Sequence, residues 1–108
     1  MENKDEDFST KFDFKGFTFE VKFTSEGLTA EELGVCEYMT SRLLIRKTLP
    51  LDIMKKVLKH EITHAILWLS GFNYVDLKDE IVCDFVSIYG EDIINISNEV
   101  FKKYMESK

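Results

Sequence analysis

The most constraining feature of the sequence is an uninterrupted helical pattern over residues 50–70. Its apolar residues recur at intervals of three and four and form one broad stripe: Ile53, Met54, Val57, Leu58, Ile62, Ala65, Ile66 and Leu69. Pro50 and Asp52 suit the first turn of such a helix, and Gly71 suits its end. We therefore predict one long helix from Pro50 to Ser70, with its apolar stripe packed against the rest of the chain.

Alternating apolar residues upstream of this helix predict strands. They include Phe12, Phe14, Phe17, Phe19, Val21 and Phe23, and the alternation slips by one residue at Lys15-Gly16. We therefore predict a β-hairpin that turns at Lys15-Gly16. A last strand is predicted from Ser41 to Lys47, and the part from Arg42 to Arg46 is expected to form an exposed edge of the sheet.

A second helical pattern follows the first. Asp76 suits its N-cap, and its expected inward face consists of Ile81, Val82, Phe85, Ile88 and Tyr89. Gly90 is expected to end or bend this helix, with a final helix or a bent continuation after it. The fold class is thus α+β, with a sheet of about three to four strands on the first helix. One domain is expected over residues 12–108, after a flexible acidic tail at residues 1–11.

Composition narrows the class of protein. The formal net charge of −6 at pH 7 disfavours general nucleic-acid binding, because such a surface repels phosphate on average. No apolar run approaches the roughly 20 residues that cross a bilayer, so no membrane role is expected. Cys36 and Cys83 match no paired metal-binding spacing, and residues 1–11 contain no apolar signal region. We expect a reducing cytoplasm; the oligomeric state is open, with a monomer as the expectation.

The chemistry of the sequence is concentrated in His60-Glu61-Ile62-Thr63-His64. These two histidines are the only ones in the chain, and they stand four residues apart, which is about one helical turn. Both imidazoles therefore project from one helix face, where they can bind one zinc ion at about 2.0 to 2.1 Å. Glu61 points about 100° further round the helix. It is placed to act as a general base on a zinc-bound water rather than as a ligand.

A catalytic zinc of this type takes three protein ligands and keeps one position for water. No further histidine exists, so the third ligand is expected among the carboxylates of the next helix, Asp79, Glu80 and Asp84. Glu80 and Asp84 stand four apart and face the same way. This spacing lets Glu80 bind the metal while Asp84 accepts a hydrogen bond from the second nitrogen of a zinc-bound imidazole. Asp79 and Asp84 stay open as alternative ligands.

The HExxH motif followed by ExxxD resembles the arrangement in gluzincins, the thermolysin-like branch of zinc peptidases. The resemblance implies that His60, His64 and Glu80 are zinc ligands, that Glu61 is the base and that Asp84 supports a ligand. From Phe12 onward the chain also resembles small phage-encoded or mobile-element proteins with a minimal zincin fold, distantly similar to ImmA/IrrE metallopeptidases. This likeness is carried by the hairpin, Gly34, Leu49-Pro50, the segment Leu58 to Glu61, and Ala65-Ile66.

The sequence therefore predicts a zinc-dependent peptidase that hydrolyses a peptide bond in a peptide or protein substrate. Unlike the larger enzymes, the chain has no spare histidine to polarise an oxyanion. Tyr38, Tyr74 and Tyr89 are the candidate oxyanion donors, although tyrosines with such spacing more often pack at the edge of a core. Trp68 can either line the metal pocket or pack in the core. Cys83 is expected to be a buried structural thiol, because it points away from Glu80 and Asp84.

Two other interpretations stay open. A non-catalytic, zinc-stabilised zincin-fold module for regulation or protein interaction would need the metal ligands but not a base beside them. Glu61 therefore favours the enzyme. A metal-free helical scaffold with accidental histidines is the weakest interpretation, because it leaves the remaining carboxylates of the motif without a role.

Overall fold

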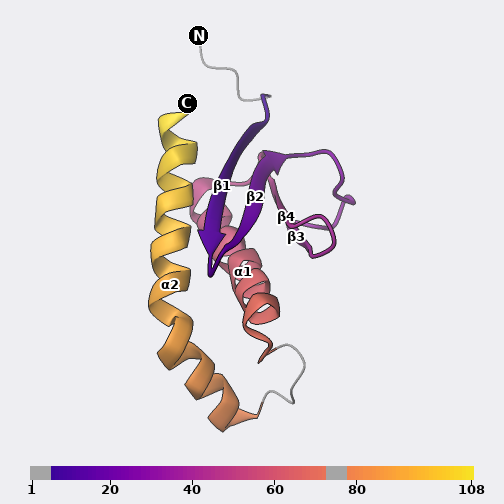
Figure 1. The fold of residues 1–108 in the computed structure, drawn as a ribbon. Helices are drawn as coiled ribbons and strands as arrows, with labels where there is room; N and C mark the ends of the chain where they lie inside the picture. The colour runs from indigo at the N-terminus through magenta and orange to yellow at the C-terminus, as the bar shows by residue number, and fades with distance from the viewer. Residues whose placement is uncertain (1–5, 73–77) are drawn as a thin grey trace.

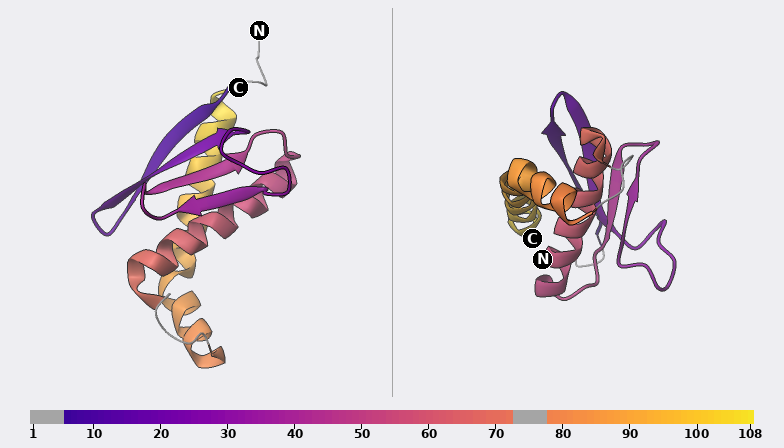
Figure 2. Two further views of the ribbon diagram at one scale, coloured as in Figure 1. Left: turned by 90° about the vertical axis from the view of Figure 1, so that its right-hand side faces the viewer. Right: turned by 90° about the horizontal axis from the view of Figure 1, so that it is seen from below.

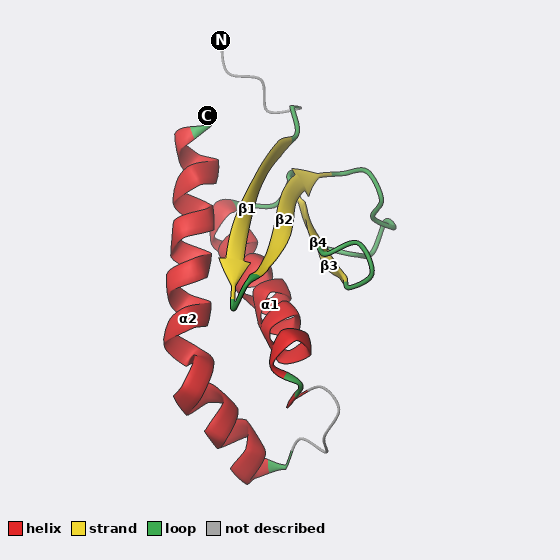
Figure 3. Ribbon diagram, in the orientation of Figure 1, coloured by secondary structure: helices red, strands yellow, loops and turns green. Residues whose placement is uncertain are grey.

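The computed structural model describes residues 6–72 and 78–108, which form a four-stranded sheet and two helices. Figures 1 and 3 show how these elements are arranged. The elements follow in the order β1 (Phe8–Phe14), β2 (Phe17–Thr24), β3 (Gly34–Glu37), β4 (Arg42–Arg46), α1 (Leu51–Ser70) and α2 (Asp79–Glu106). The predicted α+β class is confirmed.

The hairpin turns where the sequence predicted it. Lys15 and Gly16 have φ angles of 50° and 84°, and two consecutive positive values are typical of a tight two-residue hairpin turn. The strand β1 begins at Phe8, which pairs with Phe23 of β2. Residues 8–11 therefore belong to the sheet, and this corrects their assignment to a flexible tail. Alternation at the start of β1 is weak in sequence because only Phe8 of these four residues is a large apolar residue.

The strand order in the sheet is β1-β2-β4-β3. The pairs β1–β2 and β3–β4 are antiparallel, whereas β2 and β4 run parallel, with Val21 opposite Leu43. The strand that contains Arg42–Arg46 is therefore internal, and its predicted position at a sheet edge is wrong. The edge on that side is β3, a four-residue strand that the sequence pattern did not separate from the segment before β4.

Both helices cover the same face of the sheet, as Figure 2 shows. The residues that point from the sheet towards them are almost fully buried: Phe12, Phe14, Phe19, Val21, Phe23, Leu43 and Ile45. The two helices pack against each other; on the sheet, α1 packs mainly against β3 and β4, and α2 packs against β1. The half of the sheet formed by β3 and β4 is therefore the part that positions the side chains of α1.

The ends of α1 agree with the prediction, because Pro50 precedes its first residue and Gly71 ends it with a φ of 84°. The predicted N-cap Asp76 lies outside the described residues. Helix α2 continues through Gly90 to Glu106, and Figure 1 shows it changing direction along its length. Its buried face is Phe85, Tyr89, Ile93, Ser97, Val100 and Tyr104.

Two residues assigned to the inward face of α2 are exposed. Val82 is 43% exposed and Ile88 is 58% exposed. Val82 lies near the N-terminus of α2 beside an apolar hollow between the two helices. Ile88 lies outside the buried stripe of α2, whereas Tyr89 beside it packs on Phe14 of β1. Apolar spacing indicated a helix here but did not fix which of its apolar residues find a partner.

Candidate metal centre

The two histidines of the motif converge in the structure. The Nε2 atoms of His60 and His64 are 3.1 Å apart, and the ring centroids are 4.8 Å apart at an interplanar angle of 76°. Two nitrogens that bind one tetrahedral zinc at about 2.0 to 2.1 Å would be separated by roughly 3.3 Å. The pair therefore fits a single zinc ion with little movement.

Burial distinguishes Glu61 from its histidine neighbours. Glu61 is only 7% exposed, whereas His60 is exposed and His64 is half-buried. The reason is the edge strand, because a Cβ atom placed on Gly34 would lie 3.1 Å from Cγ of Glu61 and 2.7 Å from Cγ1 of Val57. Any side chain at position 34 would force β3, Val57 or Glu61 to move. Gly34 thus lets β3 cover the carboxylate-bearing side of α1.

The face of β3 that contacts α1 continues beyond Gly34. Residues two apart in a strand share a face, so Cys36 follows Gly34 on the side towards α1. Just beyond the strand, the ring of Tyr38 packs on Trp68 with 5.3 Å between centroids. Trp68 is partly buried against the core. β3 therefore runs alongside α1 from the level of Glu61 to that of Trp68.

A cavity of about 330 Å³ opens beside the base. It is lined by Leu33, Gly34, Lys56, Val57, His60 and Glu61. The cavity is therefore bounded by the edge strand β3, by the candidate metal ligand His60 and by the proposed base Glu61. This arrangement gives a ligand a route from solvent to the side chains that carry the predicted chemistry.

Burial also sets the acid–base properties of the site. Desolvation raises the pKa of Glu61, and the nearby charge of Glu32 raises it further, while His60 acts in the opposite direction. Desolvation lowers the pKa of His64, and the charge of His60 adds to this effect. A lowered pKa favours the neutral imidazole, which is the form that binds metals.

Cys36 lies against the same carboxylate. Its burial raises the pKa of the thiol to about 12, the charge of Glu61 acts in the same direction, and a hydrogen bond with Tyr38 opposes them. A thiol with such a pKa is almost entirely protonated at neutral pH. Cys36 therefore fits the structural role that the sequence suggested for it.

The carboxylates of α2 are not gathered at the histidines. Asp79, Glu80 and Asp84 are all exposed, and within residues 6–72 and 78–108 no three His, Cys, Asp or Glu side chains form a group that could hold a metal. Glu80 and Asp84 share a helix face, as predicted. Phe85, at five residues from Glu80, points about 140° away from it, so Glu80 faces away from the buried side of α2. The structure thus assembles two of the three predicted ligands.

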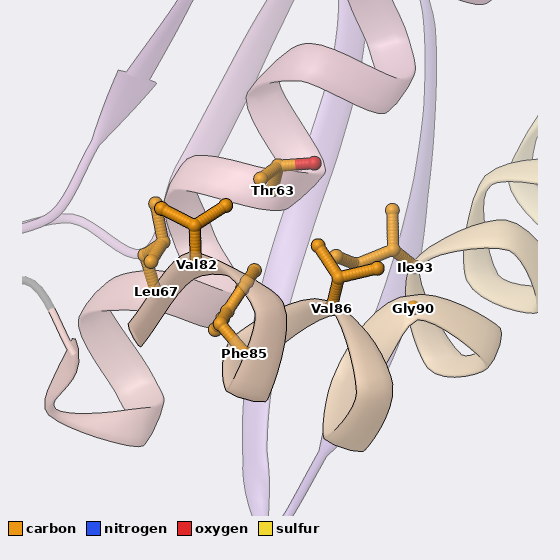
Figure 4. A pocket seen from close by; sticks show the side chains of 7 residues that line it. All are labelled: Thr63, Leu67, Val82, Phe85, Val86, Gly90 and Ile93. Atoms are coloured by element: carbon orange, nitrogen blue, oxygen red, sulfur yellow. The ribbon is translucent and has the colours of Figure 1, made fainter. Parts of the chain in front are cut away.

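An apolar hollow separates α2 from the motif on the side opposite the edge strand. Figure 4 shows its lining, which comprises Thr63 and Leu67 of α1 and Val82, Phe85, Val86, Gly90 and Ile93 of α2. Its volume is about 320 Å³. Asp79 precedes Val82 by three residues and Val86 by seven, and so lies on the same helical stripe as these lining residues. Among the three candidate ligands on α2, Asp79 is the one on the stripe that faces the hollow.

The candidate oxyanion donors have different surroundings. Tyr38 lies near the site, with its pKa raised by burial and by Cys36. Tyr89 is buried, and its hydroxyl accepts a hydrogen bond from Nζ of Lys15 at 3.2 Å, which ties it to the hairpin turn and fits the core-edge packing that the sequence also allowed for it. Tyr74 lies outside the described residues. Cys83 is exposed, so the prediction of a buried thiol at this position is wrong.

The chain was compared with known protein families, with curated proteins and with solved structures, and it matches none of them. The helices in the described part of the chain include none that is long and apolar enough to cross a membrane.

The two cysteines should differ sharply in reactivity. At pH 8, iodoacetamide should alkylate Cys83 rapidly and Cys36 slowly, because only the thiolate attacks and the pKa of Cys36 is about 12. Peptide mass spectrometry measures both rates, and the Cys83→Ser variant isolates the slow one. That slow rate should keep rising with pH up to about 12. Equal rates at the two positions would contradict the buried placement of Cys36.

Proposed function

We propose that the chain is a zinc-dependent peptidase with Glu61 as its general base. The observation that carries this proposal is the meeting of three features on one part of α1: two imidazole nitrogens 3.1 Å apart, a glutamate that is 7% exposed, and a cavity that is lined by both His60 and Glu61. A purely structural metal site needs the nitrogens but gains nothing from a desolvated carboxylate beside them.

His60 and His64 would hold the zinc, and Glu80 is proposed as the third ligand, with Asp84 hydrogen-bonded to the second nitrogen of an imidazole ligand. Since Glu80 is exposed and faces away from the buried side of α2, its ligation requires the N-terminal end of that helix to reorient. Asp79 and Asp84 are the alternative third ligands. When bound there, a zinc ion would supply Lewis-acid chemistry for the activation of water and of a carbonyl group.

The role of Glu61 follows from its surroundings. Burial against Gly34 restricts its side chain, which keeps the carboxylate near His60 rather than in bulk water. The raised pKa makes this carboxylate a stronger base than an exposed one. Glu61 would accept the proton of the attacking water and then deliver it to the departing amine. Tyr38 is proposed as the donor that faces the developing negative charge on the carbonyl oxygen.

The free edge of β3 suggests how an extended peptide would bind. Among the described residues no strand pairs with the outer side of β3, and β3 runs along α1 beside the cavity that Glu61 lines. A peptide added to β3 as a further strand would pass over His60. The peptide-binding role that the sequence assigned to the strand at Arg42–Arg46 therefore moves to β3.

The proposed setting is the cytoplasm, with the protein acting as a monomer. Cys36 and Cys83 are both free thiols, which suits a reducing compartment. The negative charge of the chain argues against nucleic acid as the partner.

Zinc should stabilise the folded chain, because a metal that binds only the folded state shifts the unfolding equilibrium. One zinc per chain is expected, and free zinc at about 100 times Kd should add about 2.7 kcal/mol to the free energy of unfolding. A chelator should reverse this gain. Thermal unfolding with and without chelator, together with metal analysis, measures the effect.

The matched variants for this prediction are His64→Ala, Glu80→Gln, Asp79→Asn and Asp84→Asn. His64→Ala should abolish the effect of zinc, and Glu80→Gln should weaken zinc binding more than either aspartate variant does. A larger loss of zinc affinity with Asp79→Asn than with Glu80→Gln would identify Asp79 as the third ligand. If chelator lowers the melting temperature of His64→Ala as much as that of the wild type, zinc is not bound at the histidines.

Glu61→Gln should separate catalysis from metal binding. The amide keeps the shape of the side chain but cannot accept a proton, so peptidase activity should fall by roughly 10² or more. Zinc content and melting temperature should change little. His60→Ala, as the control, should lose zinc, stability and activity together.

The assay compares the proteins cleaved when the wild type or Glu61→Gln is expressed in the native host. Identical cleavage profiles, with zinc bound in both proteins, would favour the non-catalytic interaction module over the peptidase.

A further inference from the structure

Lys56 lies one helical turn before His60, on the same side of α1 as both histidines. Four residues advance a helix by about 6 Å and slightly more than one turn, so Lys56, His60 and His64 form one continuous stripe. Lys56 also lines the cavity that contains Glu61. It is exposed, and in the described part of the chain the ion pairs involve other basic residues. Its ammonium group is therefore free to meet a ligand.

The two neighbouring lysines point elsewhere. Nζ of Lys55 lies 5.4 Å from the ring centroid of Phe101, which directs this side chain towards α2. Lys59 directly precedes His60 and so points about 100° away from it. Neither residue lines the cavity. Lys56 is thus the lysine of this helix that faces the candidate substrate path, and Lys59 is its matched control.

The direction of β3 relates Lys56 to a bound peptide. Since β3 runs along α1 from Glu61 towards Trp68, a strand added to its free edge would run along the stripe of Lys56 and His60. Extended residues rise about 3.3 Å each, so the 6 Å between these two positions corresponds to about two substrate residues. A side chain at that distance from the scissile bond would reach Lys56.

The charges around the cavity decide which side chain fits. Glu61 lines the cavity together with Lys56, and the net charge of −6 repels acidic peptides at long range. Lys56 can attract an acidic group in spite of this repulsion, because an ion pair acts over a few ångströms whereas salt screens the long-range repulsion. An acidic side chain of a bound peptide is therefore favourable next to Lys56.

We propose that Lys56 determines specificity by binding an acidic side chain of the substrate about two residues from the scissile bond. This inference rests on the proposed peptidase function. It names the substrate class as extended peptides with Asp or Glu at one fixed position near the cleaved bond.

Binding can be tested without metal or catalysis. The metal-free protein, labelled with ¹⁵N, is titrated with blocked alanine-based pentapeptides that carry Asp or Asn at each position in turn. At one position the Asp peptide should bind about twofold to fivefold more tightly than the Asn peptide, the range of an exposed ion pair. Amide shifts should cluster on β3 and around Lys56. The preference should vanish in Lys56→Gln, persist in Lys59→Gln and weaken with added salt.

Equal affinities for the Asp and Asn peptides, or a preference that survives in Lys56→Gln, would overturn the inference. A second arm digests a peptide mixture with the zinc-loaded protein and reads the cleavage sites by mass spectrometry, where Asp and Glu should be enriched at one position. Cleavage without this enrichment would retain the peptidase and reject the role of Lys56. A binding preference that depends on Lys56, without zinc uptake or cleavage, would reject the peptidase instead.

Discussion

The close approach of β3 to α1 at Gly34 is the contact on which the candidate site depends. Without a side chain at position 34, the edge strand lies directly against Val57 and Glu61. That contact buries the carboxylate of Glu61, raises its pKa and forms one wall of the cavity beside His60. It also holds the outer edge of β3 alongside α1. A peptide bound to that edge would therefore pass next to Glu61 and the histidines.

Much of the fold could be predicted from local patterns in the sequence. The apolar stripe of α1, the Lys15-Gly16 turn and the Gly71 cap depend on neighbouring residues, and each could be predicted. The position of β4 could not be predicted, because its parallel pairing with β2 depends on contacts between distant segments. The path of α2 through Gly90 is likewise a tertiary effect. The buried residues on both sides of Gly90, Tyr89 and Ile93, hold the helix on the core and outweigh the weak helix propensity of one glycine.

The candidate site likewise has parts that could be predicted from the sequence and parts that could not. The spacing of His60 and His64 within one helix fixes their separation, so the sequence was sufficient to place them together. The third ligand depends on how α2 docks on α1, and neither helix pattern contains that information. The role of Gly34 was also beyond the sequence, since a glycine at the start of a short strand is common, and the contacts with Val57 and Glu61 explain this one. Lys56 shared the four-residue spacing of the histidines and could have been noticed from it.

The central claim is that His60 and His64 bind one zinc ion beside a desolvated carboxylate. Anomalous X-ray diffraction at the zinc absorption edge, on crystals of the zinc-loaded protein, tests it most directly. The account predicts one strong anomalous peak per chain, about 2.0 to 2.1 Å from Nε2 of both histidines, with a carboxylate of α2 as the third ligand. An anomalous map with no peak at these nitrogens, or with its peak elsewhere on the chain, would contradict the account.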